Sequence, residues 1–269
     1  MNFKNILDDI NNTDEGFYEK ESPRRSILKS FGAKVAIAAL PIAISSVFTK
    51  SYGQTKATLI DKLNRLLKLE YLQSGFYREA LDNTGLIDGE TKASFQRILE
   101  DNNSHVAILS AAITELGGTP ITTPNIDYTG GRGNNSGPYK DSLQKYSDFL
   151  VMAQVLADSA VRAYKGEFSS FILNKKILQN VVNIHSMEAR HAAYIRNLRN
   201  IPAWTTESNN YTPVAAAQST YIDEDQKTQN GVFLVDINGF NLTENAITEA
   251  FDEPLGEADV DIILGQFVL

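Results

Sequence analysis

The side chains between residues 54 and 200 repeat an apolar pattern at spacings of three and four residues in four separate segments. This period places them on one face of a helix, so each segment is predicted to be a helix with one inward stripe. The stripes comprise Leu63, Leu67, Glu70, Ser74, Tyr77 and Leu81; Phe95, Ile98, Asn102, His105, Leu109, Ala112 and Leu116; Leu150, Ala153, Ala157, Ala160 and Tyr164; and Ile177, Val181, Ile184, Glu188, His191, Ile195 and Leu198. Four such helices bury their stripes against one another, which predicts an all-α four-helix bundle.

The connections between these segments restrict the topology. The first segment ends at residues 83–85, Gly117 ends the second, and Pro202 stops the fourth. We expect Gly166 to interrupt the third segment near its end. A glycine-rich linker, residues 119–140, joins the second segment to the third. Two short connections and one long crossover predict an up-down-down-up bundle, because such a crossover must span the length of the bundle.

Ionisable residues occupy the middle of three stripes. Glu70 lies in the first stripe, His105 in the second, and Glu188 with His191 in the fourth. Ionised glutamate is rarely buried unless it is paired or ligates a metal. Glu188 and His191 form a Glu-x-x-His pair, whose spacing of three puts both side chains on one helical face. These four residues are therefore candidate ligands of a metal ion between the helices.

Several short segments resemble the ferritin-like domain family of exported bacterial proteins, some of which are desiccation-related. The segments are residues 69–72, 76–77, 104–106, 163–166, 188–191 and 250–255. The resemblance runs from about Thr58 to the C-terminus and implies a ferritin-like bundle with a C-terminal tail packed on it. It also implies a di-metal site, to which two helices give one glutamate each and two give a Glu-x-x-His pair.

This di-metal pattern is incomplete when it is carried over onto the sequence. The first and fourth helices match it, but the second keeps His105 and has Asn102 where its glutamate would stand. The third has Ala157 on its inward stripe, where a carboxylate would be expected. Two carboxylates and two imidazoles suit one divalent ion (Fe, Mn or Zn) better than two ions, whose repulsion bridging carboxylates must offset. A hydrogen-bonded polar core that holds no metal is the alternative.

Five further residues lie beside the candidate ligands. Asn102 could orient a ligand or a bound water through its amide. Tyr77 is either a redox or hydrogen-bonding neighbour of the metal or, as we favour, a core tyrosine with a hydrogen-bonded hydroxyl. Asp101 and Asp158 could swing partly inward, but one residue turns a helix by ~100°, so we expect them to be solvated charges. His185 is expected on the flank of its helix.

Residues 1–53 have the layout of an export signal. The pair Arg24-Arg25 precedes a short apolar stretch, residues 31–48, and small residues follow it. This order resembles a twin-arginine signal peptide, which makes the twin-arginine export machinery an expected partner. A membrane anchor is the alternative, but Lys34 interrupts a stretch that is already short for a spanning helix of ~20 residues. We expect cleavage, no stable membrane partner afterwards, and a periplasmic or cell-envelope location.

The acidity of the chain lies in its last quarter. Residues 201–269 contain one lysine and 12 acidic residues, whereas residues 54–200 contain 17 basic and 15 acidic residues. Strand-like residues 232–237 and helix-like residues 243–251 and 257–267 are too few to form an independent core. We therefore expect this tail to pack along the bundle. Its scattered carboxylates favour loose solvation over an acidic docking surface.

Composition excludes several functions. The chain has no cysteine, which excludes disulfides, thiolate metal sites and iron–sulfur clusters. Its net charge of −8 argues against a nucleic-acid partner. Two functions remain: a metal-dependent redox or metal-handling protein with a stress- or metal-related role, and a structural or stress-protective envelope protein that has lost the metal chemistry. A homo-oligomer is compatible with both.

Overall fold

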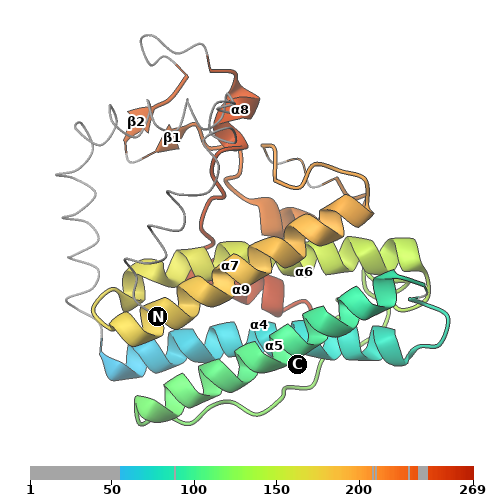
Figure 1. Cartoon of the computed structure of the whole chain (residues 1–269), viewed down its shortest axis with the longest axis horizontal. Coiled ribbons are helices and arrows are strands. Elements are labelled where there is room, and N and C mark those ends of the chain that lie inside the picture. The colour runs from blue at the N-terminus through green and yellow to red at the C-terminus, as the bar shows by residue number, and fades with distance from the viewer. Residues whose placement is uncertain (1–54, 88, 208, 210, 230, 236–241) are drawn as a thin grey trace, which may run out of the picture. The chain divides into compact units, whose positions relative to one another are not determined.

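Four long helices lie side by side in the computed structural model, which describes residues 55–87, 89–207, 209, 211–229, 231–235 and 242–269 (Figure 1). They are α4 (Lys56–Asp82), α5 (Thr91–Glu115), α6 (Tyr146–Glu167) and α7 (Lys175–Leu198). α4 packs against α5 and α6 against α7, and the pairs meet through α4–α6 and α5–α7 contacts. The four predicted helices are confirmed, and their stripes are buried except for Leu81, Leu116 and Leu198 at the ends.

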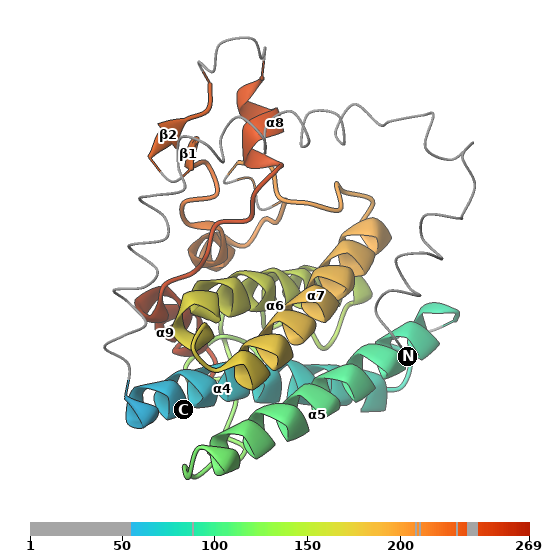
Figure 2. The ribbon, with the colours of Figure 1, turned by 60° about the vertical axis from the view of Figure 1, so that its left-hand side comes forward.

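The ends and connections of these helices follow from local chemistry. Thr55 caps α4 and Asn174 caps α7, each by accepting a hydrogen bond from a backbone N–H of the first turn (3.2 and 3.1 Å). Residues 116–145 contain no helix and form the long crossover from α5 to α6. Figure 2 shows the α4–α5 pair and the α6–α7 pair as two layers. The predicted crossover is therefore confirmed.

The C-terminal tail covers the face of α6 that the other long helices leave open. A 3₁₀ helix, η2 (Ala215–Tyr221), packs on α6, and α9 (Glu257–Leu264) packs on both α4 and α6. As a result, every residue from 149 to 164 of α6 is buried. A helix that is covered on all sides needs small or apolar residues all round, which explains the alanine-rich sequence of α6.

The secondary structure of the tail is shorter than its sequence pattern suggested. Strands β1 (Thr228–Gln229) and β2 (Val232–Phe233) are two residues long, and part of the predicted strand 232–237 lies outside the described residues. Helix α8 (Glu244–Thr248) follows the cap Thr243, whose hydroxyl accepts a hydrogen bond from Ala246 N (3.2 Å). The expected packing of the tail along the bundle is observed.

Buried cations of the bundle fix several tail carboxylates. Arg162 of α6 lies 2.7 Å from a carboxylate oxygen of Glu224, and both side chains are almost fully buried. Lys62 of α4 pairs with Glu257 of α9. The prediction of loosely solvated carboxylates is wrong for these residues, because the tail brings them directly onto basic side chains that the bundle keeps away from water.

Gly166 has a packing role that the sequence did not reveal. α6 continues through Gly166 to Glu167, so the predicted break at this glycine is wrong. The backbone N–H of Leu255 donates a hydrogen bond to the carbonyl of Arg162 (3.1 Å), and a Cβ on Gly166 would overlap the carbonyl oxygen of Leu255. Glycine at position 166 therefore allows the tail backbone to approach α6 closely.

We expect Gly166→Ala to lower the free energy of unfolding. Alanine favours a helix by about 1 kcal/mol over glycine, but overpacking against backbone costs ~1–3 kcal/mol, so the clash decides the sign. Urea denaturation measures the change. Asn183→Ala, on the exposed face of α7, is the control and should be neutral or slightly stabilising. A Gly166→Ala protein as stable as the wild type would show that the tail does not hold this close contact.

The expected export signal, residues 1–53 with Arg24 and Arg25, lies outside the described residues. Within the part of the chain that the structure describes, no helix is both long enough and apolar enough to cross a membrane.

Candidate metal centre

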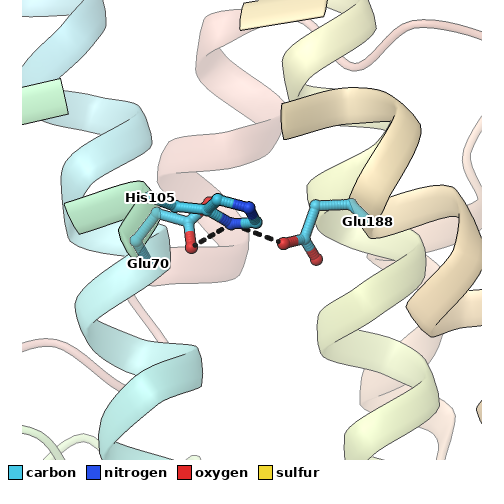
Figure 3. A group of neighbouring side chains, drawn as sticks. All are labelled: Glu70, His105 and Glu188. Carbon is cyan, nitrogen blue, oxygen red and sulfur yellow. Dashed lines mark hydrogen bonds and ion pairs between the residues drawn. The ribbon is translucent and has the colours of Figure 1, made fainter. Parts of the chain in front are cut away.

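Three side chains from three helices converge in the middle of the bundle. Glu70 of α4, His105 of α5 and Glu188 of α7 point toward one another, and Figure 3 shows them as sticks. The Nδ1 atom of His105 lies 3.3 Å from Oε2 of Glu70 and 3.1 Å from Oε1 of Glu188. One ligand atom from each residue lies within 4.8 Å of the other two. We call these residues the triad.

α6 contributes a tyrosine to the triad where a carboxylate would be expected. The hydroxyl of Tyr164 donates a 2.6 Å hydrogen bond to Oε1 of Glu70, and both side chains are fully buried. Tyr164 is thus a core tyrosine with a satisfied hydroxyl, as its place in the stripe predicts. The bond also fixes Glu70, so that Oε2 faces the centre of the bundle.

His191 lies one turn beyond Glu188 and joins the triad through it. Its Nδ1 is 3.6 Å from Oε1 of Glu188, and its Nε2 is 3.3 Å from Oδ2 of Asp101. A carboxylate that accepts the N–H of one ring nitrogen leaves the other nitrogen as a lone-pair donor, an arrangement common in metal sites. Asp101 therefore orients His191 so that Nδ1 faces the triad.

The structure corrects both expectations for the flanking aspartates. Asp101 is buried and contacts His191, and it also pairs with Arg97 at the surface (3.1 Å). Asp158 is buried away from the triad, where Arg196 binds both its oxygens (3.1 and 2.7 Å) and Tyr221 of the tail donates a 2.6 Å hydrogen bond. The prediction of solvated charges failed because the tail covers this side of α6.

His185 does not join the triad. It lies half-buried on the flank of α7, where Nδ1 is 2.9 Å from the carbonyl oxygen of Val161 and the ring packs edge-on against Phe168. This position matches the expectation for His185. Of the three histidines in the chain, His105 and His191 are therefore the two at the centre of the bundle.

Burial and charge set the protonation of the triad. Burial lowers the pKa of His105, but the two carboxylates outweigh this effect and raise its pKa to about 10. Burial raises the pKa of Glu188, but His105 and His191 lower it to about 2. Burial and the charge of Glu188 raise the pKa of Glu70. At neutral pH, His105 therefore carries a proton and a positive charge between two carboxyl groups.

The sequence of the four helices also matches a known domain. Residues 58–200, more than half of the chain, match the ferritin-like domain. The chain belongs to the ferritin-like domain family. The matched span includes most of α4 and all of α5, α6 and α7, hence every residue of the triad. No curated protein matches the chain.

The triad of this ferritin-like protein is a potential metal site. Bonds of ~2.1 Å to a tetrahedral ion place neighbouring ligand atoms ~3.4 Å apart. Nδ1 of His105 lies 3.3 Å from Glu70 and 3.1 Å from Glu188, and Nδ1 of His191 lies 3.6 Å from Glu188. Among the described residues, only those of the triad have ligand atoms that all lie within 4.8 Å of one another, so His191 lies at the edge of this group. Ala157 on α6 is fully buried and offers no ligand, so the carboxylates that a second ion would need are missing.

Polar atoms without partners surround this ferritin-like site. Oε2 of Glu188, the hydroxyl of Tyr77 and both amide atoms of Asn102 and Gln73 are buried and accept or donate no hydrogen bond among the described residues. Oε1 of Glu188 has only its ion pairs with His105 (3.1 Å) and with Nδ1 of His191 (3.6 Å). The expectation of a hydrogen-bonded Tyr77 hydroxyl is therefore not met. Gln73 was missed in the sequence, although it lies three residues after Glu70 on the same helical face. Buried groups of this kind require a partner, which a bound ion and its water ligands would provide.

Proposed function

We propose that this ferritin-like protein binds one divalent metal ion between Glu70, His105, Glu188 and His191. The observation that carries the proposal is the convergence of the triad, whose ligand atoms lie within 4.8 Å of one another, with His191 3.6 Å from Glu188 beside it. Asp101 supports it by holding His191 in the tautomer that ligates through Nδ1. Two carboxylates and two imidazoles suit Fe, Mn or Zn.

A metal-related or stress-related role follows from this chemistry. An ion held by this set would supply Lewis-acid or redox chemistry in a site closed to bulk water. The protein contributes the positioning: Tyr164 fixes Glu70, and Asp101 fixes His191. The family and the buried donor set support this role. Because the site has only two carboxylates, we propose that it binds one ion.

Metal analysis of protein purified without chelator tests the proposal. We expect about one ion per chain after loading with Fe²⁺, Mn²⁺ or Zn²⁺, as the donor count allows. Sub-stoichiometric metal under every loading condition would contradict the proposal. That result would support the second candidate, a structural or stress-protective envelope protein. The observation that favours this alternative is that protonated His105 already balances the triad without an ion.

Metal affinity should rise with pH. His105 ligates through Nδ1 only after it loses its proton, and its pKa in the metal-free protein is about 10. Burial lowers the pKa of His191, but Glu188 and Asp101 raise it overall. Each pH unit between 6 and 9 should therefore strengthen binding ~10-fold or more, with at least one proton released per ion. Titration calorimetry in two buffers of different ionisation enthalpy counts the protons. Affinity that does not change over this range would show that His105 does not bind the ion.

We also propose export of this protein by the twin-arginine route to the periplasm or cell envelope, on the strength of Arg24-Arg25 and the apolar stretch after them. This route carries folded proteins and so would allow a metal to be loaded beforehand. Cell fractionation of the wild type and of an Arg24→Lys/Arg25→Lys variant tests it. Equal export of both would contradict the proposal.

A further inference from the structure

Polar side chains without hydrogen-bond partners lie one to two helical turns beyond the triad along the bundle. In the direction from Glu70 toward the end of α4, the next turn carries Gln73 and the one after it carries Tyr77. Neither the amide of Gln73 nor the hydroxyl of Tyr77 has a hydrogen-bond partner in the described part of the chain, and both side chains are fully buried. Glu70 itself is satisfied by Tyr164 and His105, so on α4 the polar groups without partners begin one turn beyond Glu70.

α5 and α7 place matching groups at the same level. α5 runs opposite to α4, because Glu70 meets His105 while Tyr77 meets Phe95, so Asn102 lies at about the level of Gln73. α7 runs in the same direction as α4, and its next turn beyond Glu188 carries His191. The amide of Asn102 also lacks a partner among the residues described, and Nδ1 of His191 makes no hydrogen bond there, only its 3.6 Å ion pair with Glu188. We call Gln73, Asn102 and Tyr77 the neutral layer.

α6 presents small side chains beside the neutral layer. α6 runs opposite to α4, because Tyr164 meets Glu70 while Phe149 meets Phe76. The turns of α6 that follow Tyr164 in this direction carry Ala160 and Ala157, both fully buried. Three helices thus present unsatisfied polar atoms, and the fourth presents methyl groups.

The lack of charge in the neutral layer restricts the kind of ligand that it can bind. Gln73, Asn102 and Tyr77 are uncharged, and the nearby carboxylate of Asp101 is already paired with His191 and Arg97. A second divalent ion would find no free carboxylate there. Two amides and a phenol instead offer both donors and acceptors, with which a neutral molecule with an O–H group can form hydrogen bonds. Leaving these groups without a partner is unfavourable, so an occupant is expected.

We propose that the neutral layer binds uncharged oxygen ligands of about the size of water directly beside the triad. Three residues advance a helix by ~4.5 Å, so a molecule bound by Gln73 and Asn102 lies within reach of an ion held by the triad. The hydrogen-bonding site itself does not depend on a metal. The further statement, that a molecule bound at this site also ligates the metal ion, rests on the proposed function.

Oxygen-17 relaxation dispersion of water in the metal-free full chain tests the site by counting long-lived internal waters. We expect the signal of the wild type to fall in a Gln73→Met/Asn102→Leu variant, whose apolar side chains have similar volumes. Ser159→Ala is the matched control, because its buried hydroxyl is already within hydrogen-bond distance of Val155 O (2.7 Å) and of the Thr220 hydroxyl (2.9 Å). It should keep the wild-type signal. Equal signals in the wild type and the double variant would overturn the proposal.

The melting temperature of the metal-free protein gives a second readout. If the amides hold ordered ligands, Asn102→Leu alone removes bonds that the ligand and its neighbours need, and the melting temperature falls. If the amides are empty, removing an unsatisfied buried group raises it, which would overturn the proposal. Circular dichroism confirms that the variants are folded.

The relation of the neutral layer to the ion is tested separately in protein loaded with Mn²⁺. Broadening of the electron paramagnetic resonance lines by oxygen-17 water reports water bound to the ion, and it should decrease in the Asn102→Leu variant. Unchanged broadening would overturn the placement of the layer beside the ion. Failure of the wild type to bind Mn²⁺ would contradict the proposed function, whereas the relaxation dispersion of the metal-free protein would still decide the neutral layer.

Discussion

Glu188→Gln should weaken metal binding by at least ~100-fold, because changing groups that only support metal ligands already costs 10–100-fold. Glu188 is fully buried and lies 3.1 Å from His105 and 3.6 Å from His191 through Oε1, and its Oε2 has no hydrogen-bond donor in the described residues. Of the two carboxylates of the triad, Glu188 therefore has more lone pairs free to ligate an ion. Titration calorimetry at pH 8, with glutamine as a near-isosteric replacement, measures the change.

Two controls make this result specific. Glu115→Gln removes an exposed carboxylate at the end of α5 and should leave the metal affinity unchanged. In metal-free Glu188→Gln protein, the pKa of His105 should fall from about 10, because one of the two carboxylates that raise it is gone. Histidine titration by NMR measures this pKa. Wild-type affinity in Glu188→Gln, together with a lowered pKa of His105, would show that the ion binds elsewhere.

Arg162→Met should lower the free energy of unfolding by about 3–5 kcal/mol, the usual cost of breaking a buried ion pair from one side. Arg162 is 1% exposed; its guanidinium contacts Glu224 (2.7 Å) and donates hydrogen bonds to the carbonyls of Glu253 (2.7 Å), Thr220 and Ile222. Methionine has a similar length but leaves these groups without a donor. Urea denaturation measures the loss, and limited proteolysis should show an earlier cut in the tail.

The loss should also depend on pH. Burial raises the pKa of Glu224 to about 7 even beside Arg162, whereas its ordinary value is 4.5. The folded state therefore binds this proton more tightly than the unfolded state, and its contribution to stability declines as the pH rises from about 4.5 to 7. Without Arg162 the pKa rises further, so the variant should lose more stability at pH 8 than at pH 5.

A second variant separates the buried charge from packing. Arg162→Met/Glu224→Gln should recover a large part of the lost stability, because it no longer buries an unpaired carboxylate. Lys176→Met, which breaks an exposed pair with Glu115, should cost at most ~1 kcal/mol. A double variant no more stable than Arg162→Met would assign the loss to the carbonyl hydrogen bonds rather than to Glu224.

The helix period predicted the bundle because burial in a bundle is periodic. Each stripe faces the common axis, so Glu70, His105, Glu188 and His191 could be placed together from spacing alone. The structure brings the first three together and places His191 next to Glu188. Gln73 was missed because an uncharged amide in a stripe does not stand out from core-adjacent polar residues. Its distinguishing property, a pair of buried atoms without partners, depends on what the neighbouring helices offer.

The errors concern residues whose environment is made by the tail. Asp158, Gly166 and Glu224 were assigned from their own helix or segment, whereas their partners lie many residues away in the sequence. Asp101 differs, since α5 turns it far enough inward to reach His191 of α7. No local pattern records which helix face a distant, irregular segment will cover, so these contacts required the three-dimensional structure.

The all-round burial of α6 has a consequence for the order in which the protein matures. η2 and α9 cover this helix, and the backbone of Asp127 in the crossover donates a hydrogen bond to the carbonyl of Phe267 (2.8 Å). The ribosome makes α6 about a hundred residues before α9. During synthesis, the outer side of α6 therefore stays exposed to water until α9 has been synthesised. The hydrophobic core can close around α6 only after that.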